Sequence, residues 1–416
     1  MHDINIQSEI GELTSVIIHT PGPEVENMTP LSAERALYSD ILNLAVVNSE
    51  YHEFKSILKL ITQTYEIKTL LTETLEAPGA RKDLLSQICQ NEHIECLEDY
   101  FLNLPADRLA AELIEGVPIN KNTLTKFLSN ERYTLQPLHN FFFTRDAAMC
   151  FNQEIFISRM GNQVREREAL IMEVIFRHHP ALRSKSLVPS SHLAEASPIY
   201  FEGGDFLIIS ENIILIGIGA RTTSQGVDFV IDHLRKNKSR KHIIVQQLPL
   251  KPESFIHLDM VFTVIDLDLY MIYEPIILNQ YDYQTVHIIL DNGQVESIRE
   301  EKNIPAVLQK LGFEGQLALC GGKTDDWIQE REQWHSGTNF FSIGPGRVLG
   351  YNRNYRTLEE LNKRGMAILP AADILAQKTN LADYEKYVIS VAGSELARGG
   401  GGCRCMTMPL SRKPIS

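Results

Sequence analysis

The sequence predicts an α/β fold with mixed sheets. Short apolar runs of strand character recur along the 416 residues, among them SVIIHTP near residue 15, EIFISRM from 154 and IILIGIG from 213. Each run is followed by turn residues or by a helical pattern, as expected where strands alternate with helices. The run FLIIS is separated from IILIGIG by only Glu211 and Asn212, which indicates a hairpin. A simple doubly wound parallel sheet therefore fits the pattern less well.

Other segments extend the α/β pattern along the chain. We expect helices at residues 31 to 61 and 165 to 178 to cover the sheets. The remaining strand-like runs are HIIVQQLPL from 242, MVFTVIDLDLYMIYEP from 260 and RVLGYNRN from 347.

One segment differs from this alternation. From residue 71 to 127 the chain reads as several short amphipathic helices, with apolar residues at spacings of three and four. We expect a helical insertion subdomain here, set into a main domain formed by residues 1–70 and 128–416. No low-complexity linker and no sequence repeat is found, so two fully independent domains are not expected.

Composition and charge limit the kind of partner. The chain is 44% hydrophobic and 22% charged, as in ordinary globular proteins. Its formal net charge of −13 argues against nucleic-acid and anionic-membrane partners. The N-terminus lacks a basic, uninterrupted apolar signal, and no run reaches the roughly 18 apolar residues of a membrane span. Six scattered cysteines are too few for a disulfide scaffold, so we expect a cytoplasmic protein.

The C-terminal segment places two thiols after a glycine run. Arg398 is followed by four glycines, then Cys403, Arg404 and Cys405. Because ordering glycines costs conformational entropy, a retained run suggests backbone brought close to something, such as a substrate. Arg404 or a bound cation could lower the pKa of a nearby thiol. A frayed basic tail with incidental cysteines is the alternative interpretation.

Two carboxylates flank a glycine pair in the segment Glu202-Gly203-Gly204-Asp205. Turn chemistry alone explains Gly-Gly-Asp between two apolar runs. Glu202 is harder to explain in this way, because a carboxylate at a strand end is well placed to orient a histidine or hold a cation.

His257 and Asp259 are separated by one residue. If the segment were a strand, both side chains would share one face, presenting an imidazole and a carboxylate together. Such a pair suits proton transfer, although a solvated strand end would show the same pattern. No His-x-x-x-His or Cys-x-x-Cys completes a zinc site.

Three aromatic residues precede an Arg-Asp pair in the segment from Asn140 to Asp146. A buried strand ending in an ion pair would explain it. Aromatic walls beside a carboxylate also suit a planar cation. Taken together, a cysteine nucleophile, a histidine with a paired acid and several carboxylates fit attack on a guanidinium carbon, whose planar cation binds carboxylates in bidentate fashion.

The sequence resembles the arginine deiminases of the guanidine-modifying pentein superfamily. The matching motifs occur in family order and span nearly the whole chain. They are FFFTRD (141–146), REREALIMEVIFRHHP (165–180), FEGGD (201–205), ARTT (220–223), HLDMVFT (257–263), REQWHSGTN (331–339) and RGGGGCRCMTMP (398–409). The resemblance implies a five-bladed propeller of ββαβ units with a central site, and residues 71–127 resemble the insertion of the bacterial enzymes.

The resemblance also implies roles for individual residues. Cys405 matches the nucleophile, His257 the general acid and base, and Glu202 the carboxylate that orients it. The other matches are Asp146 and Asp259 for the guanidinium, Arg165 and Arg221 for the α-carboxylate, Asn140 and Phe143 for the pocket wall, and Arg398 within the glycine-rich segment. Position 403 departs from the usual glycine or proline.

The implied reaction is hydrolysis of L-arginine to L-citrulline and ammonia through a covalent thiouronium, with no metal or organic cofactor. Arg165 and Arg221 favour a free amino acid as the small-molecule substrate, because agmatine has no carboxylate for them to pair with. A hydrolase of agmatine or a methylated arginine and a catalytically silent arginine-binding pentein are the alternatives. We also expect a homo-oligomer.

Overall fold

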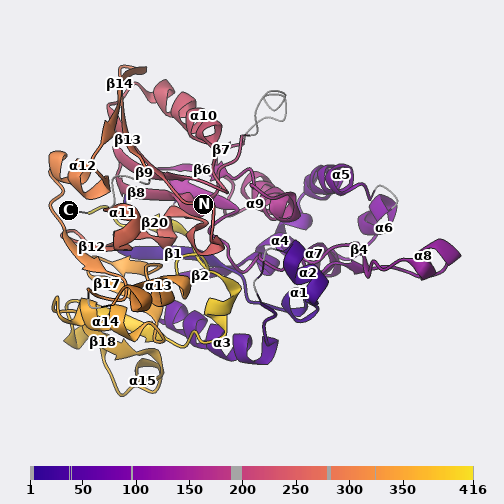
Figure 1. Cartoon of the computed structure of the whole chain (residues 1–416). Helices are drawn as coiled ribbons and strands as arrows, with labels where there is room; N and C mark the ends of the chain where they lie inside the picture. Colours follow the sequence, from indigo (N-terminus) through magenta and orange to yellow (C-terminus); the bar gives the residue numbers. More distant parts are fainter. Residues whose placement is uncertain are drawn as a thin grey trace.

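Figure 1 shows the computed structural model of the chain. The structure describes residues 4–36, 38, 40–94, 97–188, 199–278, 283–323 and 325–415. Cys96, one of the six cysteines, lies outside the described residues. Among the described residues we find no helix whose length and apolar content would suffice to span a membrane.

The predicted mixed α/β architecture is confirmed. The described residues form six sheets, and the larger ones combine parallel and antiparallel pairs. In order along the sheets, the strands are β2 (Gln63–Glu66), β1 (Leu13–Ile18) and β20 (Met408–Arg412); β5 (Ala148–Phe151), β6 (Glu154–Ile157) and β7 (Ser186–Leu187); β14 (Gln294–Glu301), β13 (Thr285–Asp291), β10 (Lys241–Gln247), β9 (Ile213–Ile218) and β8 (Phe206–Ser210); β11 (Phe262–Asp266), β12 (Leu269–Ile272) and β15 (Gln316–Leu319); β16 (Phe341–Gly344), β17 (Arg347–Tyr351), β19 (Tyr387–Val391) and β18 (Ala367–Pro370); and the small pair β3 (Val117–Pro118) and β4 (Tyr133–Leu135).

A topological unit recurs although the sequence shows no repeat. In each of the five larger sheets an antiparallel pair is extended by a strand that returns parallel after a crossover containing at least one helix. For example, β8 and β9 are antiparallel, and β10 then returns parallel to β9 after α10. The predicted hairpin FLIIS-EN-IILIGIG is this β8–β9 pair.

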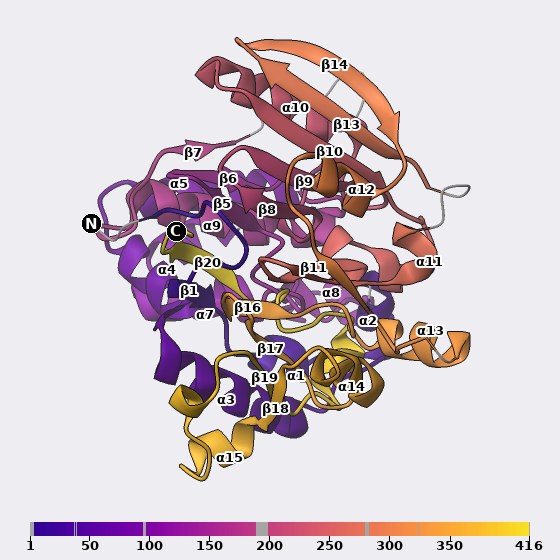
Figure 2. The same ribbon diagram turned by 90° about the vertical axis from the view of Figure 1, so that its left-hand side faces the viewer.

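Helices pack around the sheets, as Figure 2 shows for α10 and α12 beside the five-stranded sheet and for α3, α14 and α15 beside the four-stranded sheet. The helices are α1 (Pro23–Glu26), α2 (Pro30–Arg35), α3 (Leu44–Ile61), α4 (Ile67–Leu75), α5 (Ala80–Glu92), α6 (Glu98–Leu102), α7 (Ala106–Glu115), α8 (Leu124–Leu128), α9 (Glu166–His178), α10 (Ser224–Leu234), α11 (Glu274–Ile277), α12 (Ile304–Lys310), α13 (Asp326–Trp334), α14 (Tyr355–Asn362) and α15 (Ala371–Leu375).

The helix expected at 31–61 is interrupted. The interruption ends at Asn43, whose side chain accepts hydrogen bonds from the backbone N–H groups of Ala45 and Val46 and so caps the start of α3. Asparagine favours such a cap because its side-chain oxygen replaces a missing helical acceptor. The helix expected at 165–178 is α9, which begins one residue later.

Residues 67–135 contain the expected group of short helices, α4 to α8, and end in the β3–β4 pair. The apolar faces of α4, α5 and α7 share one hydrophobic core with α9 and with β5 and β6. In Figure 1, α8 lies at the end of an arm, beyond β4 and far from the five larger sheets, and none of its described residues is buried.

The two ends of the described chain lie together. Asn5 N–H donates to Leu410 O, and Arg412 N–H donates to Asn5 O, each at 2.9 Å. Because β20 pairs with β1 beside this contact, the C-terminal segment is held inside the fold. The interpretation as a frayed tail is therefore wrong.

Candidate active site

One cavity collects side chains that are far apart in the sequence. It is lined by eight of the ten residues that the sequence singled out, together with Ser254, Ile256, Trp334, Ala397 and three glycines of the 398–401 loop. The eight are Asn140, Phe143, Asp146, Arg165, Arg221, His257, Arg398 and Cys405. The remaining two, Glu202 and Asp259, are fully buried and contact His257 and Cys405 from behind. Tertiary folding thus brings all ten residues to one place.

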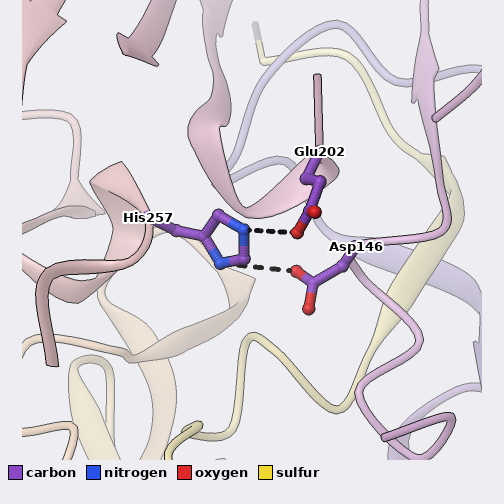
Figure 3. A group of neighbouring side chains, drawn as sticks. All are labelled: Asp146, Glu202 and His257. Atoms are coloured by element: carbon purple, nitrogen blue, oxygen red, sulfur yellow. Dashed lines mark hydrogen bonds and ion pairs between the residues drawn. The ribbon is translucent and has the colours of Figure 1, made fainter. Parts of the chain in front are cut away.

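His257 is held between two carboxylates, as Figure 3 shows. Its Nε2 lies 2.8 Å from Glu202 Oε2, and its Nδ1 lies 3.6 Å from Asp146 Oδ1. Burial disfavours the charged imidazolium, but Asp146 and the hydrogen bond to Glu202 outweigh burial and raise the pKa of His257 to about 9. The imidazole is therefore protonated at neutral pH and can donate a proton.

The backbone that carries His257 is not the strand expected from the sequence. Leu258–Met260 form a 3-10 turn, η7, and His257 precedes it in extended conformation. The turn, rather than strand alternation, directs both His257 and Asp259 towards the site. Glu202 likewise precedes a 3-10 turn, η4 (Gly203–Asp205), which leads directly into β8 as the expected strand edge requires.

The glycines of η4 allow this close packing. A Cβ at Gly203 would lie 2.0 Å from the carbonyl oxygen of Arg145, and one at Gly204 would lie 2.5 Å from His257 Nδ1. Larger residues would push the imidazole away. The Gly-Gly pair therefore has a steric reason beyond turn formation.

Cys405 faces a different environment from the one expected. Its side chain is buried, and Sγ lies 3.9 Å from Asp259 Oδ2. Burial, Asp259 and Asp146 raise the pKa of this thiol well above its ordinary value. Arg404 acts in the opposite direction, as the sequence suggested, but it is outweighed.

The Arg404 side chain donates hydrogen bonds to Glu9 and Asp259. Its Nε and Nη2 each donate to Glu9 at 3.0 Å, and its Nη1 donates to Asp259 Oδ2 at 2.8 Å. Asn339 completes this side of the site, because its Oδ1 accepts from the N–H groups of Arg404 and Cys405 and its Nδ2 donates to Asp259 O. Sequence reasoning assigned no role to Glu9 or Asn339; only the motif REQWHSGTN pointed to the latter.

The glycine run packs against protein, which explains its composition. A Cβ at Gly401 would lie 2.4 Å from the Phe143 ring, and one at Gly402 would lie 2.6 Å from Asn339. Gly400 has φ +85°, a left-handed conformation that favours glycine. These contacts place Cys405 at the cavity.

The two arginines expected to bind a carboxylate differ in their contacts. Arg165 Nη1 donates to Asp146 Oδ2 at 2.7 Å, and its Nη2 donates to Glu168 Oε2 at 2.8 Å. Arg221 has only a 3.6 Å ion pair with Glu202, and among the described residues its Nη1 finds no hydrogen-bond partner. Arg221 is thus the cation with free donor capacity for a carboxylate.

Arg398 lies at the cavity mouth. Its Nε donates to Asp40 Oδ2 at 3.1 Å and its Nη1 to Glu395 Oε2 at 2.8 Å, with a side chain that is 40% exposed. These ion pairs at the surface hold the start of the glycine loop.

The acids could also be considered as metal ligands. One ligand atom from each of Asp146, Glu202 and His257 lies within 4.8 Å of the others. Arg165 pairs directly with Asp146, and Arg221 pairs with Glu202. Two guanidinium groups beside the cluster already balance its charge and would repel a divalent ion.

Comparison of the sequence with known proteins gives a consistent answer. The sequence profile of the arginine deiminase family matches residues 34–412. The chain is 32% identical to the arginine deiminase of Borrelia garinii subsp. bavariensis, covering 100% of this chain and 99% of that protein. It is 31% identical to the arginine deiminase of Listeria innocua, with 98% of each chain covered.

Solved structures share the fold at low sequence identity. The amidinotransferase SxtG of Microseira wollei matches with a TM-score of 0.57 and 14% identity, over 100% of this chain and 98% of that one. The N-terminal domain of the cyanobacterial arginine dihydrolase ArgZ matches with a TM-score of 0.53 and 11% identity, over 96% and 98%. The profile match and the full-length relatives show that this chain belongs to the arginine deiminase family.

Proposed function

We propose that this protein is an arginine deiminase, a hydrolase that converts L-arginine and water to L-citrulline and ammonia, and that Cys405 is its nucleophile. One observation carries the assignment of the site. A thiol, a protonated imidazole and two carboxylates meet at a single cavity beside Arg221, whose Nη1 has no hydrogen-bond partner among the described residues. This set suits a substrate with a guanidinium at one end and a carboxylate at the other.

Binding would use the unpaired oxygens of the site. Among the described residues, Asp146 Oδ1 and Asp259 Oδ1 are buried without a hydrogen-bond partner. A guanidinium supplies the missing N–H donors in planar geometry. Arg221 would hold the α-carboxylate, together with Arg165 once the substrate reaches it, while Asn140 and Phe143 form the wall.

The chemistry follows from these positions. The Cys405 thiolate attacks the guanidinium carbon, and His257 donates its proton to the departing ammonia, which leaves a Cys-thiouronium. His257, now neutral, removes a proton from water, and the resulting hydroxide adds to the same carbon. The adduct then loses its hydroxyl proton to solvent, the C–S bond breaks, citrulline forms and the thiolate is regenerated. Glu202 keeps the imidazole oriented throughout.

The cationic substrate also explains the high pKa of the thiol. In the free site, Asp146 and Asp259 disfavour the thiolate. A bound guanidinium neutralises both acids and adds a positive charge beside Sγ, so thiolate formation becomes easier once substrate is present.

The carboxylate end of the pocket distinguishes arginine from agmatine. Agmatine leaves Arg221 with only its 3.6 Å ion pair to Glu202 and supplies no acceptor for Nη1, which is buried without a hydrogen-bond partner among the described residues. An unsatisfied buried donor is costly. Turnover of agmatine or of a methylated arginine faster than arginine would favour those substrates. Binding of arginine without citrulline release would identify a silent pentein.

Further parts of the proposal concern architecture and context. We propose that the five larger sheets are the blades of a pentein propeller around the cavity, with residues 71–127 as its helical insertion and 1–70 with 128–416 as the catalytic domain. We also propose a homo-oligomer in the cytoplasm. Light scattering during size-exclusion chromatography measures the oligomeric state, and cell fractionation tests the cytoplasmic location.

The direct test incubates the purified protein with L-arginine and measures citrulline and ammonia. We expect the two products in a 1:1 ratio. Acid quenching followed by peptide mass spectrometry should find the substrate adduct on the peptide containing Cys405. An adduct confined to Cys403 would contradict the assignment of the nucleophile.

A further inference from the structure

A fourth acid of the His257 region has no role in the chemistry above. Asp205, the last residue of η4, is 1% exposed, and its Oδ1 accepts a hydrogen bond from Leu258 N–H at 2.9 Å. Leu258 is the residue between His257 and Asp259. The contact therefore joins η4 to the middle of the segment that carries both groups.

The donor is one that the turn itself leaves unsatisfied. Leu258 is the first residue of η7, and no side chain of the preceding residue caps the turn. The first N–H groups of a helical turn have no internal acceptor, and a buried one needs an acceptor from elsewhere. Asp205 supplies it from a segment 53 residues away in sequence.

The surrounding backbone leaves room for this contact. A Cβ at Gly217 would lie 2.2 Å from Asp205 Oδ1 and 2.9 Å from Leu258 Cβ. Gly217, in β9, thus allows the carboxylate to reach the turn. The two turns are then joined twice, by Glu202 to His257 and by Asp205 to Leu258.

We propose that Asp205 is a positioning residue for catalysis, which fixes the η7 turn through Leu258 N–H and so sets His257 relative to Asp259 and the guanidinium carbon. This inference rests on the proposed deiminase function. His257 must reach the leaving nitrogen while Asp259 holds the same guanidinium, and small misplacements of reacting groups cost much rate.

Asp205 has a second, electrostatic effect. When Asp205 is ionised, its charge favours the imidazolium of His257. Burial raises the pKa of Asp205 itself to about 7, so this charge is fully present only above neutral pH, where the basic limb lies. The other charged or titratable groups around His257 come from several elements. They are Asp146 and Glu202, Arg165 and Arg221 behind these acids, Asp259 on the same turn with its partner Arg404, and the Cys405 thiol beside Asp259.

Three variants separate the effect of holding the η7 turn in position from the effect of the charge on Asp205. D205N keeps an oxygen acceptor for Leu258 N–H and removes the charge. D205A removes both. G217A keeps the charge but pushes the carboxylate from the turn. The measurements are kcat and KM for citrulline release, the basic limb of the kcat/KM profile against pH, and circular dichroism to verify folding.

We expect kcat to fall roughly 10- to 100-fold in D205A and in G217A, with a smaller change in KM, because binding groups remain while their geometry loosens. D205N should keep kcat within about threefold of the wild type, because amide oxygens also accept hydrogen bonds. In D205N and D205A the basic limb should move to lower pH by roughly half a unit or more, because a neighbouring negative charge is lost. In G217A this limb should move less.

A matched control is available outside the site. Asp266 is also buried, at 4% exposure, and its Oδ1 accepts a hydrogen bond from Leu267 N–H at 2.8 Å. D266A should reduce stability but leave kcat and the pH profile unchanged. Equal losses of kcat in folded D205A and D266A would indicate a structural role only.

These outcomes test the positioning role of Asp205, and they differ from the result expected if the proposed deiminase function is wrong. If folded D205A keeps the kcat of D205N, or if folded G217A keeps wild-type kcat, the positioning role is wrong. The two variants break the contact from opposite sides, so failure of one to fold leaves the other as the test. Absence of citrulline release by the wild type would instead contradict the deiminase function itself.

Discussion

The pocket has a His257 side and a Cys405 side, and its acids raise the pKa of both groups with different chemical consequences. On one side, Asp146 helps to raise the pKa of His257 to about 9, which keeps the imidazole charged and ready to donate a proton. On the other side, Asp146 and Asp259 raise the pKa of the Cys405 thiol, which keeps the nucleophile protonated. These two pKa shifts favour a protonated imidazole, which can act as an acid, and a protonated thiol, which is a poor nucleophile. A cationic substrate beside Asp146 and Asp259 lowers the pKa of the thiol and so favours the thiolate.

The halves also differ in how they are built. The His257 side comes from residues 140–260, where η4 and η7 lie against each other and glycines allow the approach. The Cys405 side joins Glu9 near the N-terminus, Asn339 and the C-terminal loop. The first half depends on two local turns, whereas the second depends on contacts across almost the whole chain.

The largest expected effect is on the nucleophile, and it separates two neighbouring thiols. C405S should lower kcat at least roughly 1,000-fold, because a serine hydroxyl has no comparable means of activation here. C403S should retain activity, because no step uses that thiol. Citrulline release by both variants at matched protein concentration measures the contrast. Near wild-type release by C405S would exclude Cys405 as the nucleophile.

Removal of the acid on the other side should come next. H257Q should lower kcat roughly 100- to 10,000-fold, the usual contribution of general acid and base catalysis. Single-turnover mass spectrometry should find the Cys405 adduct formed slowly, because ammonia departs without a proton donor. If H257Q retained half of the wild-type kcat, the proton transfers would have to be assigned to another group.

A smaller effect is expected at the carboxylate end, shared by both halves. R221Q should raise KM for L-arginine roughly 10- to 100-fold while changing agmatine turnover little, because only arginine has a carboxylate to lose a charge-assisted contact. Arg240, which forms surface ion pairs with Asp291 and Glu296, offers a control, and R240Q should resemble the wild type. Equal losses for both substrates in R221Q would indicate a structural role.

The smallest effect concerns stability against pH. The pKa of His257 is about 9 in the folded protein and near 6.5 when unfolded, so its contribution is fully present below pH 6.5 and is lost as pH rises through 9. The wild type should lose a few degrees more in Tm than H257Q between pH 6.5 and 9.5. Thermal unfolding at one scan rate measures this difference. Parallel pH dependences in the two proteins would show that the folded pKa is not raised.

The sequence predicted the fold class and the residues of the site better than it predicted the local backbone conformation at the site. Alternating apolar runs indicated mixed α/β sheets, and the two-residue gap before Ile213 predicted the β8–β9 hairpin. The His257–Asp259 segment was expected to be a strand, because a spacing of two residues fits strand alternation. It is a turn, since Asp205 satisfies the Leu258 N–H and Gly204 lets the imidazole approach, and no local pattern contains these contacts.

The amino-acid sequence specifies which functional groups this protein has: the thiol, the imidazole, the acids and the glycines that no larger residue could replace. The protonation states of the thiol and the imidazole depend on how the chain folds. The pKa values of His257 and Cys405 depend on burial and on charges more than 50 residues away in the chain. Electrostatic interactions act through distance in space and through the loss of water, so the residue order alone does not contain them.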